Sequence, residues 1–483
     1  MKFVWLVLGV FAARFLATAI AFPQGDGDLR WQRWLGRTIL ARRAIPRALG
    51  AETFSVAGAH WTPQEWAFSL VAAHATAGLA WVCFAGTIAL CAVLALGIVA
   101  YHAVRRGASS RAVVFCTALA GIGLFASFGV RVQVVAWPLL ALYLLLLDAE
   151  GPWAFAAIVV AALWSNLHAS AMLAPVLAAV ATLGTAVDER GVTLPVRRML
   201  AITGGSAIAL CCNPFGWDLP LYALTLFSSP IREQISEWQP TVLSDVSFAA
   251  GALPLLLIGL LFFADRGGRR VRDLLLLGAT TYLMLGAVRN IAVFCLVAVP
   301  LVAPALTRGM RLFAPDGRRP TERSERAARV ALPAISAMLA IVVAIGLLRS
   351  TERARDRLGA RAIASLASLP GDRRLFCADF AWCGLALGAP HVRVFLDGRA
   401  DPYPLAVWTD FDKIARLRSD WRAALRRYDV DTLLVERDSP LDQAVTLTRA
   451  WRATYRDAHF AVWVLLQRRG REAVWVARVV APA

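Results

Sequence analysis

Two aspartates lie two residues apart near the start of the chain, in the run Asp26-Gly27-Asp28. Carboxylates at this spacing can hold a divalent metal such as Mg²⁺ or Mn²⁺, or one of them can act as a general base. Because aspartate and glycine also favour turns, a solvated turn around Gly25 and Gly27 explains the same pattern. The run alone leaves the catalytic, metal-binding and turn interpretations open.

A third carboxylate, Glu65, lies in the run from Trp61 to Trp66. This run is at the end of the polar segment that begins near the two aspartates. An aromatic belt at a membrane interface explains both tryptophans without any chemistry. A carboxylate at the start of a helix interacts favourably with the helix dipole, and it can also line a pocket. Glu65 is therefore a third candidate catalytic residue beside Asp26 and Asp28.

Other polar residues at the ends of apolar runs could bind substrate. Arg131 and Arg289 can reach lipid headgroups, or they can bind a lipid-linked phosphate, because a guanidinium group forms paired hydrogen bonds with phosphate oxygens. His168 can equally be a hydrogen-bond partner between helices. The candidate substrate-binding residues are predicted to share one side of a membrane: Trp31, Trp61, Arg131, Asn166, His168, Glu237 and Arg289.

The composition indicates that these residues belong to an integral membrane protein. Of the 483 residues, 58% are hydrophobic, and the mean hydropathy is +0.58. Soluble domains are typically about 45–50% apolar, and several apolar runs here approach the roughly 20 residues that cross a bilayer as a helix. The runs predict about eleven transmembrane helices, near residues 3–22, 66–101, 112–129, 132–148, 153–168, 169–186, 199–213, 247–264, 273–288, 290–307 and 330–348.

The charge distribution predicts the orientation of these helices. The formal net charge is +18, and nearly all of the cations are arginines. Arginines in short loops between apolar runs are typical of cytoplasmic loops, which argues against nucleic-acid binding. With the N-terminus in the cytoplasm, the tail falls outside, and all of the arginine-rich loops fall inside: 102–111, 187–198, 265–272 and 308–329.

The pattern predicts two domains. Residues 1–348 form the transmembrane domain, including an outer loop at 23–65, and residues 349–483 form a small α/β domain outside the membrane. Strands are predicted at 374–377, 392–396, 432–436 and 462–467, and helices at 405–427 and 441–455. Asp397-Gly398-Arg399 follows the second strand, where it can form a structural turn or a functional loop. In an oxidising compartment, Cys377 and Cys383 could form a disulfide.

The chain resembles the bacterial membrane proteins of the GT-C glycosyltransferase superfamily, in the group with a periplasmic α/β tail. The first outer loop of that group reads Asp-x-Asp-x-x-Trp-His and closes with Trp-x-x-x-Glu-Trp, and Gln32 replaces the histidine here. The matching residues are Asp26, Asp28, Trp31, Gly36, Trp61, Glu65, Trp66, Asn166 to His168, Asn213 to Gly216, Glu237, Trp238, Arg289, Trp382, Gly384 and Phe395 to Arg399.

The resemblance implies a multi-pass protein of the bacterial inner membrane that takes a sugar from a polyprenyl-phosphate donor. It implies direct displacement at the anomeric carbon, with Asp26 or Asp28 deprotonating or orienting the acceptor hydroxyl, either directly or through a divalent metal. Arg131 and Arg289 would then stabilise the departing phosphate. Nothing in the pattern indicates an oligomeric state.

Two other function classes fit part of the pattern. A transporter or flippase of lipid-linked material would also carry arginines and aromatic residues around a cavity, but alternating access predicts polar residues on both faces. A non-catalytic envelope assembly protein would use the tail to dock partners. Substitution of the outer-loop aspartates separates the assembly protein from the enzyme.

Overall fold

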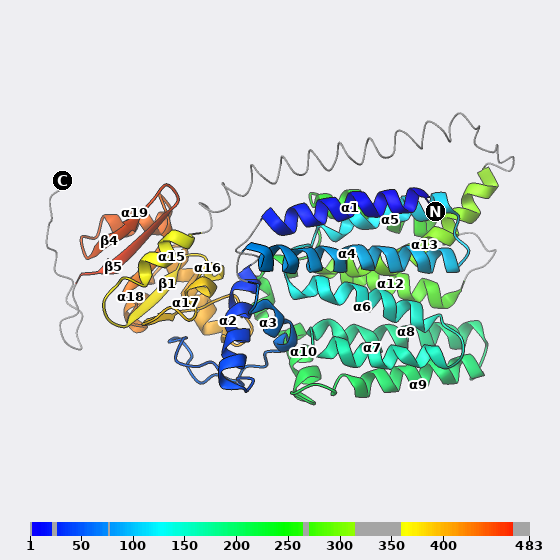
Figure 1. Cartoon of the computed structure of the whole chain (residues 1–483), viewed down its shortest axis with the longest axis horizontal. Coiled ribbons are helices and arrows are strands. Elements are labelled where there is room, and N and C mark those ends of the chain that lie inside the picture. Colours follow the sequence, from blue (N-terminus) through cyan, green and yellow to red (C-terminus); the bar gives the residue numbers. More distant parts are fainter. Residues whose placement is uncertain (1, 22–26, 76–77, 264–269, 314–358, 467–483) are drawn as a thin grey trace. The chain divides into compact units, whose positions relative to one another are not determined.

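The computed structural model describes residues 2–21, 27–75, 78–263, 270–313 and 359–466, and they form two compact units (Figure 1). The first unit comprises residues 1–21, 77–228 and 235–348, and the second comprises 22–76, 229–234 and 349–483. The predicted boundary assigned the outer loop to the transmembrane domain. The contacts instead group this loop with the tail.

The first unit is helical throughout its described residues. Helices long and apolar enough to cross a membrane are Phe3–Ile20, Gly78–Arg105, Ala169–Asp188 and Val288–Met310, and shorter apolar helices accompany them. The helices of this unit are α1 (Lys2–Ala21), α4 (Gly78–Arg105), α5 (Ser110–Leu124), α6 (Val132–Leu147), α7 (Ala156–Ser165), α8 (Leu173–Asp188), α9 (Leu194–Ala209), α10 (Asp218–Ser228), α11 (Leu253–Phe263), α12 (Val271–Gly286) and α13 (Ile291–Phe313).

These helices pack side by side (Figure 1). Apolar side chains are exposed on many of them as well as buried between them. Most of α13 is buried, whereas Leu79 and Leu260 are 78% and 59% exposed. Apolar side chains exposed over many helices are unfavourable in water, whereas contact with lipid chains is favourable for them. The chain is therefore a multi-pass membrane protein.

One predicted membrane span is divided. The run at 66–101 forms α3 (Trp66–Ala72), which belongs to the second unit, and α4, which begins in the first. Gly78, at the start of α4, has a φ of +58°, a conformation that interrupts a continuous helix. The predicted span at 330–348 lies outside the described residues, so the number of eleven spans stays a prediction.

An ionic cluster joins the ends of α4 and α6 to the start of α12. Asp148 follows α6 and pairs with Arg272 at 2.6 Å, Arg106 at 3.2 Å and His102 at 2.8 Å. Arg106 also pairs with Asp273 at 2.5 Å. Because buried charges are costly unless paired, this mutual pairing lets the charges remain at the helix ends.

The second unit contains a five-stranded sheet in the order β2-β1-β3-β5-β4. Strands β2 and β3 run parallel to β1, while β5 runs antiparallel to β3 and β4. Their bounds are β1 (Arg373–Cys377), β2 (Val392–Val394), β3 (Thr432–Glu436), β4 (Trp451–Arg456) and β5 (Phe460–Leu465). The sheet agrees with the predicted α/β tail.

The two helices predicted in the tail differ from those in the structure. The helix predicted at 405–427 is two helices, α17 (Leu405–Ala415) and α18 (Trp421–Arg427). The helix predicted at 441–455 is α19 (Pro440–Thr446) followed by β4, because Trp451, Thr454 and Tyr455 favour a strand that pairs with β5. The other tail helices are α15 (Ala360–Leu366) and α16 (Phe380–Ala386).

The outer loop contains a helix, α2 (Gly27–Arg42), where the sequence predicted a polar segment. Its buried apolar residues include Leu29, Leu35 and Ile39, and Asp28 lies in its first turn. It packs so closely on α3 that a Cβ on Gly36 would lie 1.8 Å from the carbonyl oxygen of Ser69. Only glycine permits this approach.

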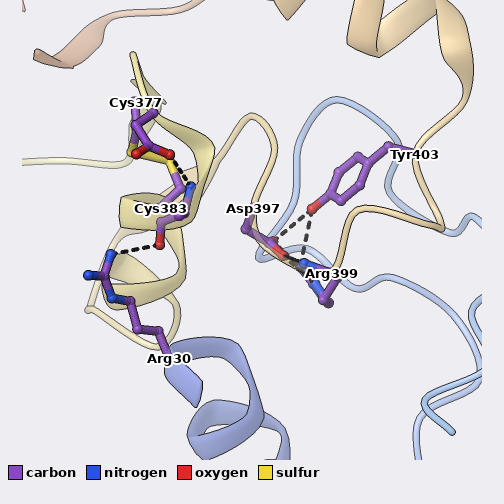
Figure 2. Close-up of a disulfide and its surroundings, with 8 residues drawn as sticks. Arg30, Cys377, Cys383, Asp397, Arg399 and Tyr403 are labelled. Atoms are coloured by element: carbon purple, nitrogen blue, oxygen red, sulfur yellow. Dashed lines mark hydrogen bonds and ion pairs between the residues drawn. A yellow bond between two sulfur atoms is a disulfide. The ribbon is translucent and has the colours of Figure 1, made fainter. Parts of the chain in front are cut away.

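The outer loop and the tail also share hydrogen bonds. The Arg30 guanidinium on α2 donates to the carbonyl of Ala381 on α16 at 3.0 Å, beside the Cys377–Cys383 disulfide (Figure 2). Farther along the loop, Thr53 forms a parallel bridge with Val394 at the outer edge of β2. The loop thereby covers a strand edge that would otherwise expose unpaired backbone groups.

Candidate functional site

Glu65 and Gln32 form the centre of a polar group in the second unit. Gln32, on α2, is fully buried, and its side-chain amide donates a hydrogen bond to Oε2 of Glu65. Glu65 is 6% exposed and lies directly before α3, and its other oxygen accepts from Gln64 at 3.3 Å. The tight packing of α2 on α3 holds Glu65 in this place.

The surroundings of Glu65 favour its neutral form. Burial raises the pKa of its carboxyl to about 8, the negative charge of Asp28 adds to this rise, and Asp401 contributes less. Hydrogen bonds from Gln32 and Gln64 act in the opposite direction without cancelling the rise. At neutral pH this carboxyl therefore holds a proton while it feels the charge of Asp28.

Asp401 is a member of this group that sequence reasoning did not select. It lies two residues after Arg399, in the turn that follows β2. The sequence predicts a structural turn or a functional loop for the preceding run, Asp397-Gly398-Arg399. A signal was present, because functional residues of α/β domains often follow strand ends, but nothing in the sequence joined the tail to Glu65.

Arg399, a buried arginine of the tail, forms hydrogen bonds with residues of both the tail and the outer loop. Figure 2 shows its position beside Asp397 and Tyr403. Asp397 accepts hydrogen bonds from the Arg399 side chain at 2.6–3.1 Å and from the Tyr403 hydroxyl at 2.7 Å. Arg399 also donates to Glu52 at 3.1 Å and to Thr53 at 2.7 Å. Every one of these groups is paired, as a stable buried charge requires.

Tryptophans surround the same guanidinium group. The Arg399 guanidinium lies 5.0 Å from the ring centroid of Trp34 and 5.0 Å from that of Trp61. Trp61 contacts Trp31 edge to face, with ring centroids 6.0 Å apart. Trp31 and Trp61, both predicted to bind substrate, are buried, and they belong to the aromatic cluster beside Arg399.

The first unit carries a separate group of charged residues. Arg131, before α6, pairs with Glu237 at 2.5 Å, and the Arg289 guanidinium lies 3.9 Å from the same carboxylate. Arg289 also lies over the Trp238 ring, 4.4 Å from its centroid. These three charged side chains are 17–25% exposed, so solvent and small ligands can reach them.

The charges within this group determine what it can bind. Burial opposes ionisation of Glu237, but the charges of Arg131 and Arg289 outweigh this effect and lower its pKa. The Glu237 carboxylate therefore lies beside two guanidinium groups, those of Arg131 and Arg289. An anion such as a phosphate suits this arrangement, because guanidinium groups bind its oxygens in pairs.

His168 and Asn166 belong to the first unit and differ in their surroundings. The positive charges of Arg131 and Arg289 act on the buried His168 ring. The backbone N–H of Ser170 donates to Nδ1 of His168 at 3.1 Å, which leaves the neutral ring with its hydrogen on Nε2. The Asn166 amide donates to the carbonyls of Ala162 at 2.9 Å and Cys212 at 2.7 Å, contacts that tie the ends of α7 and α9.

The predicted metal ligands are not both described. Asp26 lies outside the described residues, and Asp28 is in the first turn of α2. Among the described residues there is no group of three histidine, cysteine, aspartate or glutamate side chains that could hold a metal. The described residues do not by themselves form a metal centre.

Comparison with known proteins places the fold. No protein-family model and no curated protein matches the chain. Among solved structures, the oligosaccharyltransferase AglB from Archaeoglobus fulgidus, in complex with an inhibitory peptide and a dolichol-phosphate, has a TM-score of 0.54 and 14% identity. The match covers 89% of this chain and 69% of that one.

Two further structures support the same assignment. ArnT from Cupriavidus metallidurans has a TM-score of 0.51 and 16% identity, covering 95% of this chain and 97% of that one. The mycobacterial arabinofuranosyltransferase AftD has a TM-score of 0.53 and 17% identity, covering 95% of this chain and 41% of that one. At such identities the likeness establishes the fold, which is that of the GT-C glycosyltransferases, as the sequence motifs predicted.

Proposed function

We propose that the protein is a membrane glycosyltransferase that moves a sugar from a polyprenyl-phosphate donor to an acceptor outside the cytoplasm. The GT-C fold supports this proposal, since the structural neighbours are named as glycosyl or oligosaccharyl transferases. The dolichol-phosphate in the archaeal structure supports a lipid-linked donor. We further propose that the protein resides in the bacterial inner membrane, with the N-terminus in the cytoplasm and the tail in the periplasm.

The observation that carries the proposal is the unequal pair of carboxyls in the second unit. Glu65 keeps its proton at neutral pH, in part because Asp28 nearby is negatively charged. Carboxyls whose surroundings separate their pKa values are a common basis for acid–base catalysis. We assign Asp28 as the general base, with Asp26 as the other candidate, and Glu65 as its protonated neighbour.

The reaction is a single displacement. The acceptor oxygen attacks the anomeric carbon while its proton passes to Asp28. The bond from the anomeric carbon to the phosphate oxygen breaks, and its electron pair stays on the polyprenyl phosphate. Attack from the side opposite the leaving group inverts the configuration at that carbon. Once Asp28 is protonated, it no longer raises the pKa of Glu65, so the pair can release a proton to solvent.

The charged group of the first unit fits the donor phosphate. As the sugar bond breaks, negative charge grows on the departing phosphate, and positive groups fixed in advance stabilise it. We assign Arg131 and Arg289 to this role, with Glu237 holding the two guanidinium groups before the donor binds. His168, whose ring hydrogen is on Nε2, is assigned as a further hydrogen-bond donor to substrate.

The transporter alternative has weaker support. Alternating access requires groups that bind substrate at both ends of the helices. The charged residues at the far ends of α4 and α6 are occupied with one another, since Asp148 pairs with three partners and Arg106 pairs with both aspartates. Among the described residues, this cluster sets two aspartates against two arginines, so the cluster itself has no excess positive charge for a phosphate.

The proposal is tested by a transfer assay. Purified protein in lipid vesicles is supplied with a panel of radiolabelled polyprenyl-phosphate sugars and with membrane extract as acceptor. We expect one donor to label the acceptor, and Asp28→Asn to reduce that labelling. Donor lipids that cross the bilayer without any transfer would instead favour the transporter.

A further inference from the structure

A pocket of about 530 Å³ lies within the second unit, on a different face of α2 from the residues that surround Glu65. A volume of this size is typical of small-molecule sites. The helix contributes Trp34, Arg37, Thr38, Ala41 and Arg42. The rest of the wall comes from the loop and the tail: Ala51, Glu52, Leu387, Gly388, Ala389 and Val392.

The residues from α2 follow the spacing i, i+3, i+4, i+7 and i+8, which places them on one helix face. A face that only packs against a neighbour would be apolar at these positions. Here it carries a tryptophan, two arginines and a threonine, and the tail packs beside it without filling the space. This polar face supplies the charged and hydrogen-bonding groups that a ligand in the pocket would contact.

The part of the tail that lines the pocket comes close to Trp34. Gly388 has a φ of +84°, and a Cβ at this position would lie 3.1 Å from Cδ1 of Trp34. A glycine therefore allows the turn and the close approach together. The Arg399 guanidinium lies over the Trp34 ring, so the indole is held in place while it lines the pocket.

The pocket carries positive charge that its own residues do not balance. Arg37 and Arg42 are exposed, and neither has an ion pair among the described residues. Arg33, one turn before Arg37, has its pKa lowered to about 10 by burial and by the charge of Arg37. An anionic group bound near these arginines would relieve this repulsion.

Other groups in the pocket suit hydroxyls. The Glu52 carboxylate, held by Arg399 at 3.1 Å and by the backbone N–H of Gly50 at 3.0 Å, can accept further hydrogen bonds, and Thr38 can donate or accept. The Trp34 ring provides apolar area for the carbon face of a sugar ring. Because the arginines suit an acid group while Glu52, Thr38 and Trp34 suit a hydroxylated ring, the set of groups favours a ligand that carries both.

We infer that this pocket binds an acidic saccharide, one that carries a carboxylate or phosphate group, and that it holds the acceptor glycan during transfer. The acid group pairs with Arg37 and Arg42, and the sugar ring contacts Trp34. The role of the pocket as an acceptor subsite rests on the proposed glycosyltransferase function, whereas the binding of the saccharide is independent of that function.

Titration calorimetry on the full chain in detergent tests this inference with three probes: a disaccharide containing glucuronic acid, a neutral disaccharide and inorganic phosphate. We expect the acidic disaccharide to bind at least about tenfold more tightly than the other two, since a hydrogen bond to a charged group is worth about that factor or more. The double variant Arg37→Gln, Arg42→Gln should lose this preference. Because both side chains are exposed, it should unfold at the wild-type temperature.

The control variant is Arg422→Gln, Arg426→Gln on α18, which removes equal charge beside another tryptophan, Trp421. It should bind as the wild type does. Equal affinity in the wild type and in the Arg37, Arg42 variant would overturn the inference, and so would equal affinity for phosphate and the acidic disaccharide. Saccharide binding without any sugar transfer would contradict only the proposed glycosyltransferase function. Sugar transfer without preferential binding of the acidic disaccharide would contradict only the proposed pocket.

Discussion

The side-chain amide of Gln32 donates a hydrogen bond to the carboxylate oxygen of Glu65 in a buried position. In the GT-C group that the sequence resembles, a histidine occupies the position of Gln32. An amide cannot take up a proton, so a proton that leaves the acceptor must reside on a carboxyl here. The protonation of Glu65 is therefore the subject of the first prediction.

We expect the stability of the protein to fall as the pH rises between about 4.5 and about 8. The pKa of Glu65 is raised from 4.5 to about 8 in the folded protein, so in this range the folded state binds more protons than the unfolded state. The slope approaches about 1.4 kcal/mol per pH unit for one such group. Thermal unfolding in detergent at pH 6 and pH 8 measures it.

The Glu65→Gln variant provides the matched comparison, because glutamine keeps the shape and never ionises. Its melting temperature should change less between these two pH values than that of the wild type. An equal change in both proteins would mean that Glu65 does not titrate in this range.

Asp397→Ala is expected to destabilise the protein by about 3–5 kcal/mol, because it leaves the buried Arg399 guanidinium without its main partner. Denaturant unfolding measures this loss. Transfer by the fraction that remains folded should equal that of the wild type if the pair has only a structural role. Transfer that disappears while the melting temperature stays constant would place Asp397 in the reaction.

Arg289→Ala is expected to weaken use of the donor by about ten- to a hundredfold, since a hydrogen bond to a charged group contributes roughly 1.5–3 kcal/mol. Because Arg289 is assigned to the negative charge that grows on the departing phosphate, the loss should appear in kcat and in kcat/KM for the polyprenyl-phosphate sugar. Arg111→Ala removes an exposed arginine at the start of α5 and serves as the control. An unchanged kcat/KM in Arg289→Ala would exclude this arginine from a role at the donor phosphate.

The arginine-rich loops predict a cytoplasmic N-terminus and a periplasmic tail. A reporter enzyme that is active only in the periplasm should therefore work when fused after Ala483 and fail when fused near Gly317. A cytoplasmic reporter at the same two positions should give the opposite result. The reverse pattern would place the candidate residues on the wrong side of the membrane for the proposed acceptor.

The sequence predicts the membrane class and the tail well because those signals are local. Long apolar runs are the local signal of membrane helices, and β-branched runs such as Thr432 to Glu436 are the local signal of the strands in the tail. Helix α2 was missed because charged residues alternate with its buried ones, which makes the segment resemble a polar loop. Strand β4 was not predicted because the run 441–455 has helical periodicity, although Trp451, Thr454 and Tyr455 favour a strand once β5 is there to pair with them.

The candidate site is less predictable because it depends on contacts between distant segments. Asp28 and Glu65 were selected from one loop, but Asp401 acts on Glu65 only because the tail folds together with that loop. In the same way, Arg131 has no acidic neighbour in the sequence, and Glu237 becomes its partner only in the fold. Pairing across such separations leaves no local pattern.

The most direct measurement of the central claim is the rate of sugar transfer by the Asp26→Asn, Asp28→Asn double variant. Asparagine keeps the size of each side chain and removes its charge, and the variant must first be shown to fold like the wild type. If one of these aspartates is the general base, transfer should fall by about 10²- to 10⁴-fold. Full transfer by this variant, beside a wild type shown to be active, would contradict the assignment of the catalytic site.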